Sequence, residues 1–449
     1  MELRWVLLAG LLPGAVAGAV PGGDGDPLIP LTPGQRMRRE HLETTHREVE
    51  LIRKTRVPLP EPAGGLHDYR CIFHAHAQDS YHTAGTLPEM LADARKAGVQ
   101  AVFLGSHYRP PVDFMASWRG LHDGVLFVPG SEVRGFLIHP MESMIPKMEA
   151  PVPEFLSAVN AGGGLAFLSH VEERPDHPME GLAGLEIYNR HYDAKRDMAG
   201  LISMAMSLTG PRELLELQDL VRLYPDEILA AQVQRDEIYL DKWDRETAAG
   251  RRLTGVAAND CHHNQVFVMR MVSTNEVGVG TSVDKEKDLK RVNASLRPGI
   301  LELVKGHNPG DLLASVDLDP YYRSFRDSST HLLADELTEA SLRQALRDGR
   351  AYVSHDWMCD PTGFSFGTAD GSGPSQGGSG AFRAGMALVA RTTAPCHLEL
   401  FRGGKKVAEG DGRELRFEPA GPGVFRIEAS FTIDGERRPW IYSNPVYLN

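Results

Sequence analysis

Short, continuous apolar runs alternate with amphipathic segments from about residue 66 onward. The apolar runs are YRCIF, QAVFLG, GVLFVPG, GFLIH, LAFLSH, LEIYN and TGVAAND, and each has the length of a buried strand. Helix-like segments separate several of them, beginning with TLPEMLADARKAG at Thr86 and continuing with residues 152–161. Continuous apolar strands alternating with helices are typical of a parallel sheet covered on both faces. So many β/α steps within residues 66–275 favour a barrel or near-barrel.

Three other segments extend this organisation. Residues 20–65 are predicted to be a linker with one helix over 33–56. Within the barrel, residues 194–251 are charged and helix-like, which indicates a helical insertion that either shapes a cleft or forms a solvated packing layer. Residues 276–357 are predicted to connect the barrel to a C-terminal domain.

Polar and apolar positions alternate with a period of two in the last part of the chain. MALVARTT, CHLELFRGG, LRFEP and GVFRIEASF are separated by GG, GDG and PG turns. This pattern predicts an antiparallel β-sandwich over residues 358–449. The predicted fold class is therefore α/β, a distorted barrel with a helical insertion, followed by an antiparallel β-sandwich.

The first residues, MELRWVLLAGLLPGAVAGAV, have the pattern of a secretory signal peptide. Arg4 precedes an apolar run that ends in small residues, and Ala15-Val16-Ala17 resembles a cleavage site. We expect residues 1–19 to be removed and the protein to be exported, to the periplasm or the extracellular space; an uncleaved anchor is the alternative. No later stretch reaches the roughly 18 uninterrupted apolar residues of a membrane helix, so no span is expected after cleavage.

Charge and cysteine content narrow the expected partners. The 449 residues include 48 basic and 60 acidic side chains, a net charge of −12, which disfavours non-specific binding to nucleic acid or anionic lipid. A small anionic substrate is still compatible, because bound metal ions reverse the local field. We expect Cys71 and Cys261 to be buried thiols, and the sequence leaves open whether Cys359 and Cys396 pair.

Histidines and carboxylates gather at the ends of the predicted strands. FHAHAQDSYH follows the first strand, and later strands end in FLGSH, VPGSE, FLIH, LAFLSH and AANDCH. The candidate metal ligands are His74, His76, His82, His107, Glu132, His139, His170, Asp260 and His262. A β/α barrel brings such strand ends together at one rim, and alternate residues of a strand share a face, so His74 and His76 suit one ion. A mixed set of imidazoles and carboxylates suits two or three divalent ions, Zn, Mn or Fe.

Further side chains near this rim are candidates for proton transfer and substrate binding. The candidates for catalysis are Glu132, His82, His107 and His191, and those for substrate binding are Arg109, Arg134, Asn189 and Arg190. An arginine fork suits phosphate or carboxylate, so three arginines near one rim favour a small anionic substrate. Each of these side chains is also compatible with an ordinary surface or packing role.

These motifs, in this order, resemble the PHP superfamily, named for polymerase and histidinol phosphatase, whose fold is a distorted (β/α)7 barrel. The resemblance covers residues 66–275 and rests on HxHxxxxxH from His74, LADARKAGVQAVFLGSH, VPGSE, GGLAFLSH, GLEIYN and AANDCH. It implies metal ligation by His74, His76, His82, His107, Glu132, His170, Asp260 and His262, with Glu132 as the bridging carboxylate and His139 at the position of a further ligand.

This sequence departs from the family pattern at two positions. Ser106 precedes His107 where the second motif usually has Asp, and Val171 follows His170 where Pro is often found. Neither change removes a ligand, but both leave the orientation of the neighbouring histidine open.

The C-terminal segments GRAYVSHDWMCDPTGFSF and RPWIYSNPVYL are similar to an exported subgroup of the superfamily with an appended β-sandwich, which includes the carbaryl-hydrolase-type enzymes. The leading hypothesis is an exported metal-dependent phosphoesterase that activates water. The second is hydrolysis of a carboxyl ester, carbamate or amide at the same site. The third is a non-catalytic envelope protein that binds metal structurally. The substrate, the native metal and the oligomeric state stay open.

Overall fold

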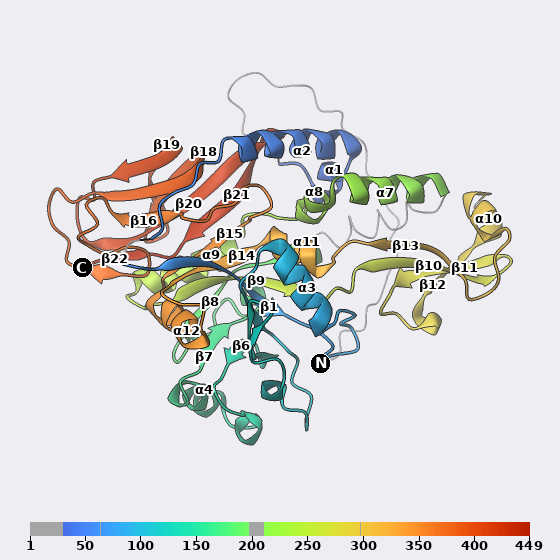
Figure 1. Ribbon diagram of the computed structural model, residues 1–449, viewed down its shortest axis with the longest axis horizontal. Coiled ribbons are helices and arrows are strands. Elements are labelled where there is room, and N and C mark those ends of the chain that lie inside the picture. Colours follow the sequence, from blue (N-terminus) through green and yellow to red (C-terminus); the bar gives the residue numbers. More distant parts are fainter. Residues whose placement is uncertain (1–29, 63, 197–210, 297) are drawn as a thin grey trace. The chain divides into compact units, whose positions relative to one another are not determined.

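The computed structural model describes residues 30–62, 64–196, 211–296 and 298–449 of the chain (Figure 1). Residues Leu31–Asn449 form one compact unit. The predicted signal peptide, residues 1–19, lies outside the described residues. Within the described ranges, no helix combines the length and the apolar character that crossing a bilayer requires.

The barrel is built around a set of parallel strands. These are β1 (His67–Ala75), β2 (Ala101–Leu104), β4 (Val125–Val128), β7 (Leu165–Leu168), β8 (Gly184–Asn189) and β9 (Thr254–Cys261). Pairing runs from β1 through β2 to β4 on one side, and from β1 through β9 and β8 to β7 on the other. The strands close into a barrel, and the α/β class predicted from the apolar runs is confirmed.

One predicted strand runs in the opposite direction. β5 (Ser131–Val133) and β6 (Phe136–His139) form an antiparallel hairpin, and β6 is also antiparallel to β7. The two-residue turn between them, Arg134-Gly135, has φ values of 55° and 87°, the left-handed backbone that tight hairpins require. β3 (Gly120–His122) is antiparallel to β4. The barrel sheet is therefore mixed, where the sequence pattern predicted parallel strands.

Helix boundaries follow the capping residues. Thr86 caps α3 (Leu87–Ala97) in a reciprocal pair with Glu89, and Gly98, at a φ of 72°, ends it. The predicted helix over 152–161 is α4 (Val152–Ala161). The other helices are α1 (Pro33–Arg36), α2 (Arg39–Lys54), α5 (Arg190–Arg196), α7 (Pro211–Leu223), α8 (Pro225–Ala230), α9 (Glu237–Ala248), α10 (Pro298–Val304), α11 (Tyr321–Asp327) and α12 (Glu339–Asp348). Helices α7, α8 and α9 fall within the predicted helical insertion, residues 194–251. Residues 197–210 of that insertion lie outside the described residues.

The predicted connecting region is a structured part of the fold. A separate four-stranded sheet has the order β12-β11-β10-β13. Its strands are β10 (Val266–Ser273), β11 (Glu276–Thr281), β12 (Lys290–Asn293) and β13 (Leu312–Asp317). Because β10 and β11 form one antiparallel hairpin, the predicted boundary at residue 275 falls in its turn.

The C-terminal strands are mostly antiparallel, and they continue the barrel sheet. They are β16 (Ser365–Thr368), β17 (Ser379–Gly380), β18 (Leu388–Arg402), β19 (Lys405–Phe417), β20 (Gly423–Ile433), β21 (Glu436–Ser443) and β22 (Val446–Leu448). Pairing passes from β1 to β14 (Ser329–Ala334), β15 (Ala351–Ser354), β21 and β20. Helix α2 packs on β18 and β20 (Figure 1), and buried Arg36 donates to both oxygens of Glu436. All four cysteines are buried and free, including Cys359 and Cys396.

A buried ion cluster lies where the two parts of this sheet meet. His331 on β14 donates from Nδ1 to Asp68, at 2.7 Å, and from Nε2 to Asp356, at 3.1 Å. An imidazole that donates from both nitrogens is protonated. Burial alone would lower the pKa of His331, but the two carboxylates raise it to about 10. Since the pKa in the unfolded chain is about 6.5, this cluster stabilises the fold in full below about pH 6.5 and loses that contribution as the pH rises through about 10.

We predict that His331→Gln lowers the free energy of unfolding by about 3–5 kcal/mol near neutral pH, because it leaves buried Asp68 without its cation and Asp356 with Arg70 alone. The difference between wild type and variant, measured by denaturant unfolding, should shrink as the pH is raised towards about 10. The exposed His307→Gln is the control and should change little. A difference that stays constant over this pH range would contradict the assignment.

Candidate metal centre

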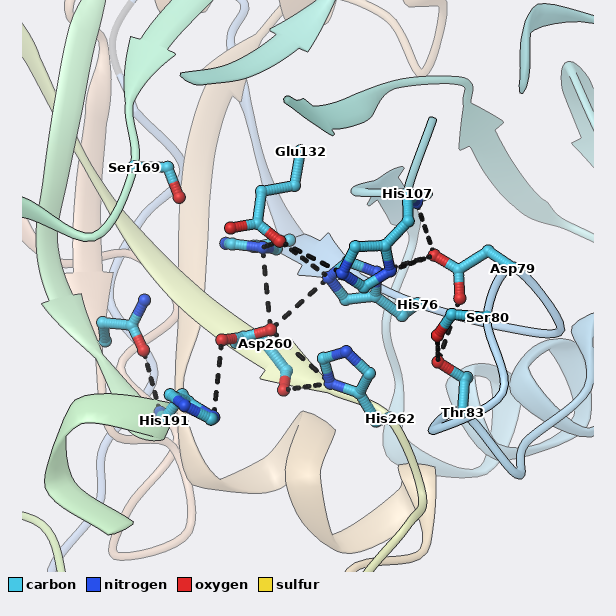
Figure 2. Close-up of polar contacts among 12 residues, drawn as sticks. His76, Asp79, Ser80, Thr83, His107, Glu132, Ser169, His191, Asp260 and His262 are labelled. Carbon is cyan, nitrogen blue, oxygen red and sulfur yellow. Dashed lines mark hydrogen bonds and ion pairs between the residues drawn. The ribbon is translucent and has the colours of Figure 1, made fainter. Parts of the chain in front are cut away.

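Seven of the nine predicted ligands meet at one end of the barrel. Figure 2 labels His76, His107, Glu132, Asp260 and His262 among them. The seven form three overlapping groups in which all donor atoms lie within 4.8 Å of one another. The groups are His76, His107 and His262; His74, His76 and Glu132; and His74, His170 and Asp260. His74 and His76 come from the end of β1, and the others from the ends of β2, β5, β7 and β9 or directly after them.

Glu132 is the central carboxylate. Its Oε1 lies 3.0 Å from Nε2 of His170, and its Oε2 lies 3.5 Å from Nε2 of both His74 and His107. The two oxygens therefore face different imidazoles. This is the arrangement expected of a carboxylate shared between ions.

Asp260 faces the same space from β9. Its Oδ1 lies 3.4 Å from Nε2 of His76 and 3.6 Å from Nε2 of His74, and its Oδ2 lies 3.6 Å from Nε2 of His170. Figure 2 shows Asp260 between Glu132 and His262. Asp260 thus contributes to the same polar space as Glu132 from the opposite side.

The backbone is left-handed at one whole ligand group. His74, His170 and Asp260 have φ values of 60°, 47° and 48°. For residues with a β-carbon this conformation costs about 1–3 kcal/mol each, and it persists only where the surrounding structure imposes it. At His74 it coincides with a break in the register of β1 with both neighbours. The strain turns the three side chains towards one another.

The chemistry of the buried nitrogens fits a bound cation. Nδ1 of His74 donates to Glu186 and Nδ1 of His76 donates to Asp79, each at 2.8 Å. With hydrogen at Nδ1, each ring in its neutral form presents its lone pair at Nε2, facing the carboxylate oxygens described above. Among the described residues, no hydrogen-bond partner exists for Nε2 of His74, His76 or His262, or for Oδ1 of Asp260. Divalent metal ions would satisfy all four atoms.

Glu186 holds this arrangement from outside. Its Oε1 accepts from His74 Nδ1, at 2.8 Å, and from the hydroxyl of Ser169, at 3.0 Å. Its Oε2 accepts from the backbone N–H of His170, at 2.8 Å, and from the amide of Asn189, at 3.0 Å. Such partners fix the tautomer and orientation of metal ligands. Glu186 is not among the residues predicted from the sequence, although a glutamate inside the apolar strand GLEIYN is a signal of a buried acceptor.

The electrostatic balance of the site favours cations. Burial alone would lower the pKa of His170, but the carboxylates of Glu132 and Glu172 raise it to about 12. Burial would raise the pKa of Glu132, yet hydrogen bonds from His170 and His74 hold it well below its usual range. The pKa of Asp79 is likewise low, because hydrogen bonds from His107 and His76 outweigh its burial. Protons and metal ions therefore compete for the same atoms.

His82 and His191 lie at the edge of the cluster and are partly accessible. The His82 ring is 4.8 Å from that of His107 and 5.1 Å from that of His262. Nδ1 of His191 lies 3.9 Å from Oδ2 of Asp260, and its side chain is 47% exposed. Both are placed to exchange protons with solvent, and their role in catalysis stays a prediction.

His139 belongs to none of the three groups. Because β6 is antiparallel, its last residue pairs with Leu165, where β7 begins, and not with the end of that strand. The imidazole is buried edge-on against Phe73 and Phe103, and Nδ1 faces the carbonyl of Pro129 at 3.4 Å. Burial lowers the pKa of His139 to about 3. Metal binding by His139 stays a prediction of the sequence pattern that this geometry does not favour.

The predicted substrate-binding residues separate into different environments. Arg134 donates to the carbonyls of Met148 and Ala150, so its guanidinium is engaged outside the cluster. Arg190 is only 4% exposed, and Asn189 accepts from the backbone of α5 while it donates to Glu186. Arg109 is exposed two residues after His107. Of the three arginines, only Arg109 is therefore both exposed and free of a described hydrogen bond from its side chain.

A further group, His397, Glu399 and Glu409, lies on β18 and β19. The ammonium of Lys406 contacts both carboxylates, at 2.9 and 2.7 Å. In this group the positive charge of Lys406 therefore already offsets carboxylate charge, unlike in the cluster at the strand ends.

Among known proteins, similarity was found to solved structures only. No protein-family profile matches the chain, and no curated protein matches it. Among solved structures, a two-domain protein from Bacteroides vulgatus containing a predicted PHP-like metal-dependent phosphoesterase is similar, with 14% sequence identity and a TM-score of 0.33. The match covers 87% of this chain and 98% of that one. A likeness of this size carries no functional argument, so the function proposed below depends on the site.

We predict that His139→Gln leaves the number of metal ions bound per chain unchanged, because His139 lies outside the ligand groups. His170→Gln should lower that number, because His170 faces both Glu132 and Asp260. Metal content after reconstitution and desalting, measured by elemental analysis, checks both variants. An equal loss in the two variants would make His139 a ligand and contradict this geometry.

Proposed function

We propose that this protein is a metal-dependent hydrolase of the PHP superfamily that binds two or three divalent ions, Zn, Mn or Fe. The observation that carries the proposal is a set of buried atoms, Nε2 of His74 and His76 and Oδ1 of Asp260, that face one another without a hydrogen-bond partner among the described residues, with Glu132 beside them. A purely structural site is less compatible with this arrangement, because His82 and His191 leave it open to solvent. Export of the protein stays a prediction from residues 1–19.

The ligand groups define where ions would be held. His76, His107 and His262 offer nitrogen alone, whereas the other two groups combine imidazoles with Glu132 or Asp260. Bound divalent ions supply a Lewis acid for the scissile group and make water a stronger acid. The chain's own part is to hold the ligands in place and to move protons.

Proton transfer falls to the accessible histidines. His191 is exposed and lies beside Asp260, so it is placed to deliver a proton to a leaving group. His82 is the alternative donor on the opposite side, next to His107 and His262. Glu132 and Asp260 stay ionised, because their pKa values are held well below the usual range despite burial.

We favour a phosphoester as the bond cleaved, because clustered cations and the exposed Arg109 suit an anionic group. A carboxyl ester, carbamate or amide is the second candidate. It is favoured by the states of Arg134, whose guanidinium binds backbone carbonyls, and Arg190, which is only 4% exposed. The substrate therefore meets fewer fixed cations than the sequence pattern predicted.

We predict that the protein reconstituted with Mn or Zn hydrolyses phosphomonoesters or phosphodiesters faster than carboxyl esters and carbamates. The double variant His74→Ala, His76→Ala should lose all of this activity, because it removes ligands from every group. Turnover assays on a panel of chromogenic esters, with circular dichroism to show that the variant folds, provide the measurement. Unchanged hydrolysis in the folded double variant would contradict the assignment of the metal site.

We also predict that Arg109→Gln raises KM for an anionic substrate about tenfold or more, since a hydrogen bond to a charged group contributes about 1.5–3 kcal/mol. Arg134→Gln is the matched control and should leave KM unchanged, because its guanidinium binds backbone carbonyls. Steady-state kinetics of both variants provide the two KM values. Equal KM values in both variants would favour a neutral substrate.

A further inference from the structure

Asp79 is a buried carboxylate beside the ligands but outside every ligand group. It lies on the loop between β1 and α3, and Figure 2 shows it on the far side of His76 and His107 from Glu132 and Asp260. Its Oδ2 accepts from Nδ1 of His76 at 2.8 Å, from Nδ1 of His107 at 2.9 Å and from the backbone N–H of His107 at 2.6 Å. Its Oδ1 accepts from the hydroxyl of Thr83 at 2.9 Å.

This single oxygen sets the chemical form of two rings. A carboxylate only accepts hydrogen bonds, so both Nδ1 atoms must carry hydrogen and both neutral rings present their lone pair at Nε2. Both Nε2 atoms then face the interior of the cluster. The ring centroids of His76 and His107 lie 4.4 Å apart, with planes 27° from parallel, and the His262 ring lies 4.1 Å from that of His76.

The same contacts join two separate parts of the chain. His76 follows β1 and His107 follows β2, and the backbone bond from His107 to Asp79 fixes the second strand end to the first loop. Ser106 left the orientation of His107 open in the sequence, and Asp79 provides the missing acceptor. The bond to Thr83 holds the carboxylate itself, on the loop that also carries His82.

We propose that Asp79 is a positioning residue that creates the nitrogen-only metal site of His76, His107 and His262. The inference rests on the proposed function, since it requires that the cluster binds metal. Without Asp79, the rings of His76 and His107 are both free to turn or to change tautomer. The ion at the nitrogen-only site then loses two of its three imidazole ligands. The group of His74, His170 and Asp260 keeps all its ligands, with Glu186 as its own support, and the group of His74, His76 and Glu132 keeps two of its three.

The test compares Asp79→Ala, Asp79→Asn and Thr83→Val with wild type in the full-length protein. Zn affinities are measured by competition with a chromogenic chelator, and bound Zn is counted after dialysis. Loss of an outer partner of a metal ligand typically weakens binding 10–100-fold. Asp79→Ala should weaken the Zn held by His76, His107 and His262 by about this factor and leave the Zn held by His74, His170 and Asp260 unchanged. Asp79→Asn keeps an acceptor oxygen and should recover part of the affinity, and Thr83→Val, which among the bonds to Asp79 removes only the one to Oδ1, should weaken binding less than Asp79→Ala.

A spectroscopic readout separates positioning from general destabilisation. In the Zn-loaded protein, the Nδ1–H protons of His76 and His107 should give strongly downfield-shifted NMR signals because they donate to a carboxylate. These two signals should disappear or move upfield in Asp79→Ala, and shift less in Asp79→Asn, while the Nδ1–H signal of His74 stays in place.

Two results would overturn the inference. If wild type binds Zn and Asp79→Ala binds the same number of ions with the same affinity, Asp79 has no positioning role and the proposed function stands. If wild type binds no Zn, the result contradicts both the inference about Asp79 and the proposed function. Should Asp79→Ala fail to fold, wild-type affinity and unmoved signals in Asp79→Asn would be the overturning result.

Discussion

The metal centre depends on lone pairs that face one another in a buried space. Glu186 and Asp79 engage the outer nitrogens of His74 and His76, so the inner nitrogens point towards carboxylate oxygens 3.4–3.6 Å away. Two lone pairs at such a distance repel each other unless a cation lies between them. The carboxylates raise the pKa of the buried His170, because a proton there supplies positive charge. A bound metal ion would supply positive charge in the same space. The rest of the fold can be understood as the means of holding these groups together.

The fold meets this constraint with strain at the rim and dense packing beneath it. The left-handed backbone at His74, His170 and Asp260 turns the side chains inward, a conformation that stiff surroundings must impose. Those surroundings include the stacked rings of Phe73 and Phe103, 4.2 Å apart, with Phe167 edge-on beside them. Gly105 allows the close approach, since a β-carbon there would lie 2.8 Å from the His74 ring. The C-terminal strands extend the same sheet through β14 and β15, so they add to the rigidity of the barrel.

Features encoded by local sequence were predictable, and features created by tertiary contacts were not. The helix α4 has its predicted bounds, and Thr86 and Gly98 mark the ends of α3 because capping is a local interaction. The grouping of seven candidate ligands could be predicted because each lies within or just after the end of an apolar strand. The reversed direction of β6 was missed, although the Arg134-Gly135 pair between SEV and FLIH is the signal of a two-residue hairpin. That reversal accounts for the position of His139. Asp79 was missed because its role depends on His107, a residue 28 positions away.

The most direct test of the account is the anomalous diffraction of crystals grown from protein reconstituted with Zn or Mn. The account predicts at least two metal peaks at the carboxyl ends of the barrel strands, one bonded to Nε2 of His76, His107 and His262 and one bonded to His74, His170 and Asp260, at distances of about 2.0–2.3 Å. Fully loaded crystals without a peak among these residues, or with ions only at the group of His397, Glu399 and Glu409, would contradict it.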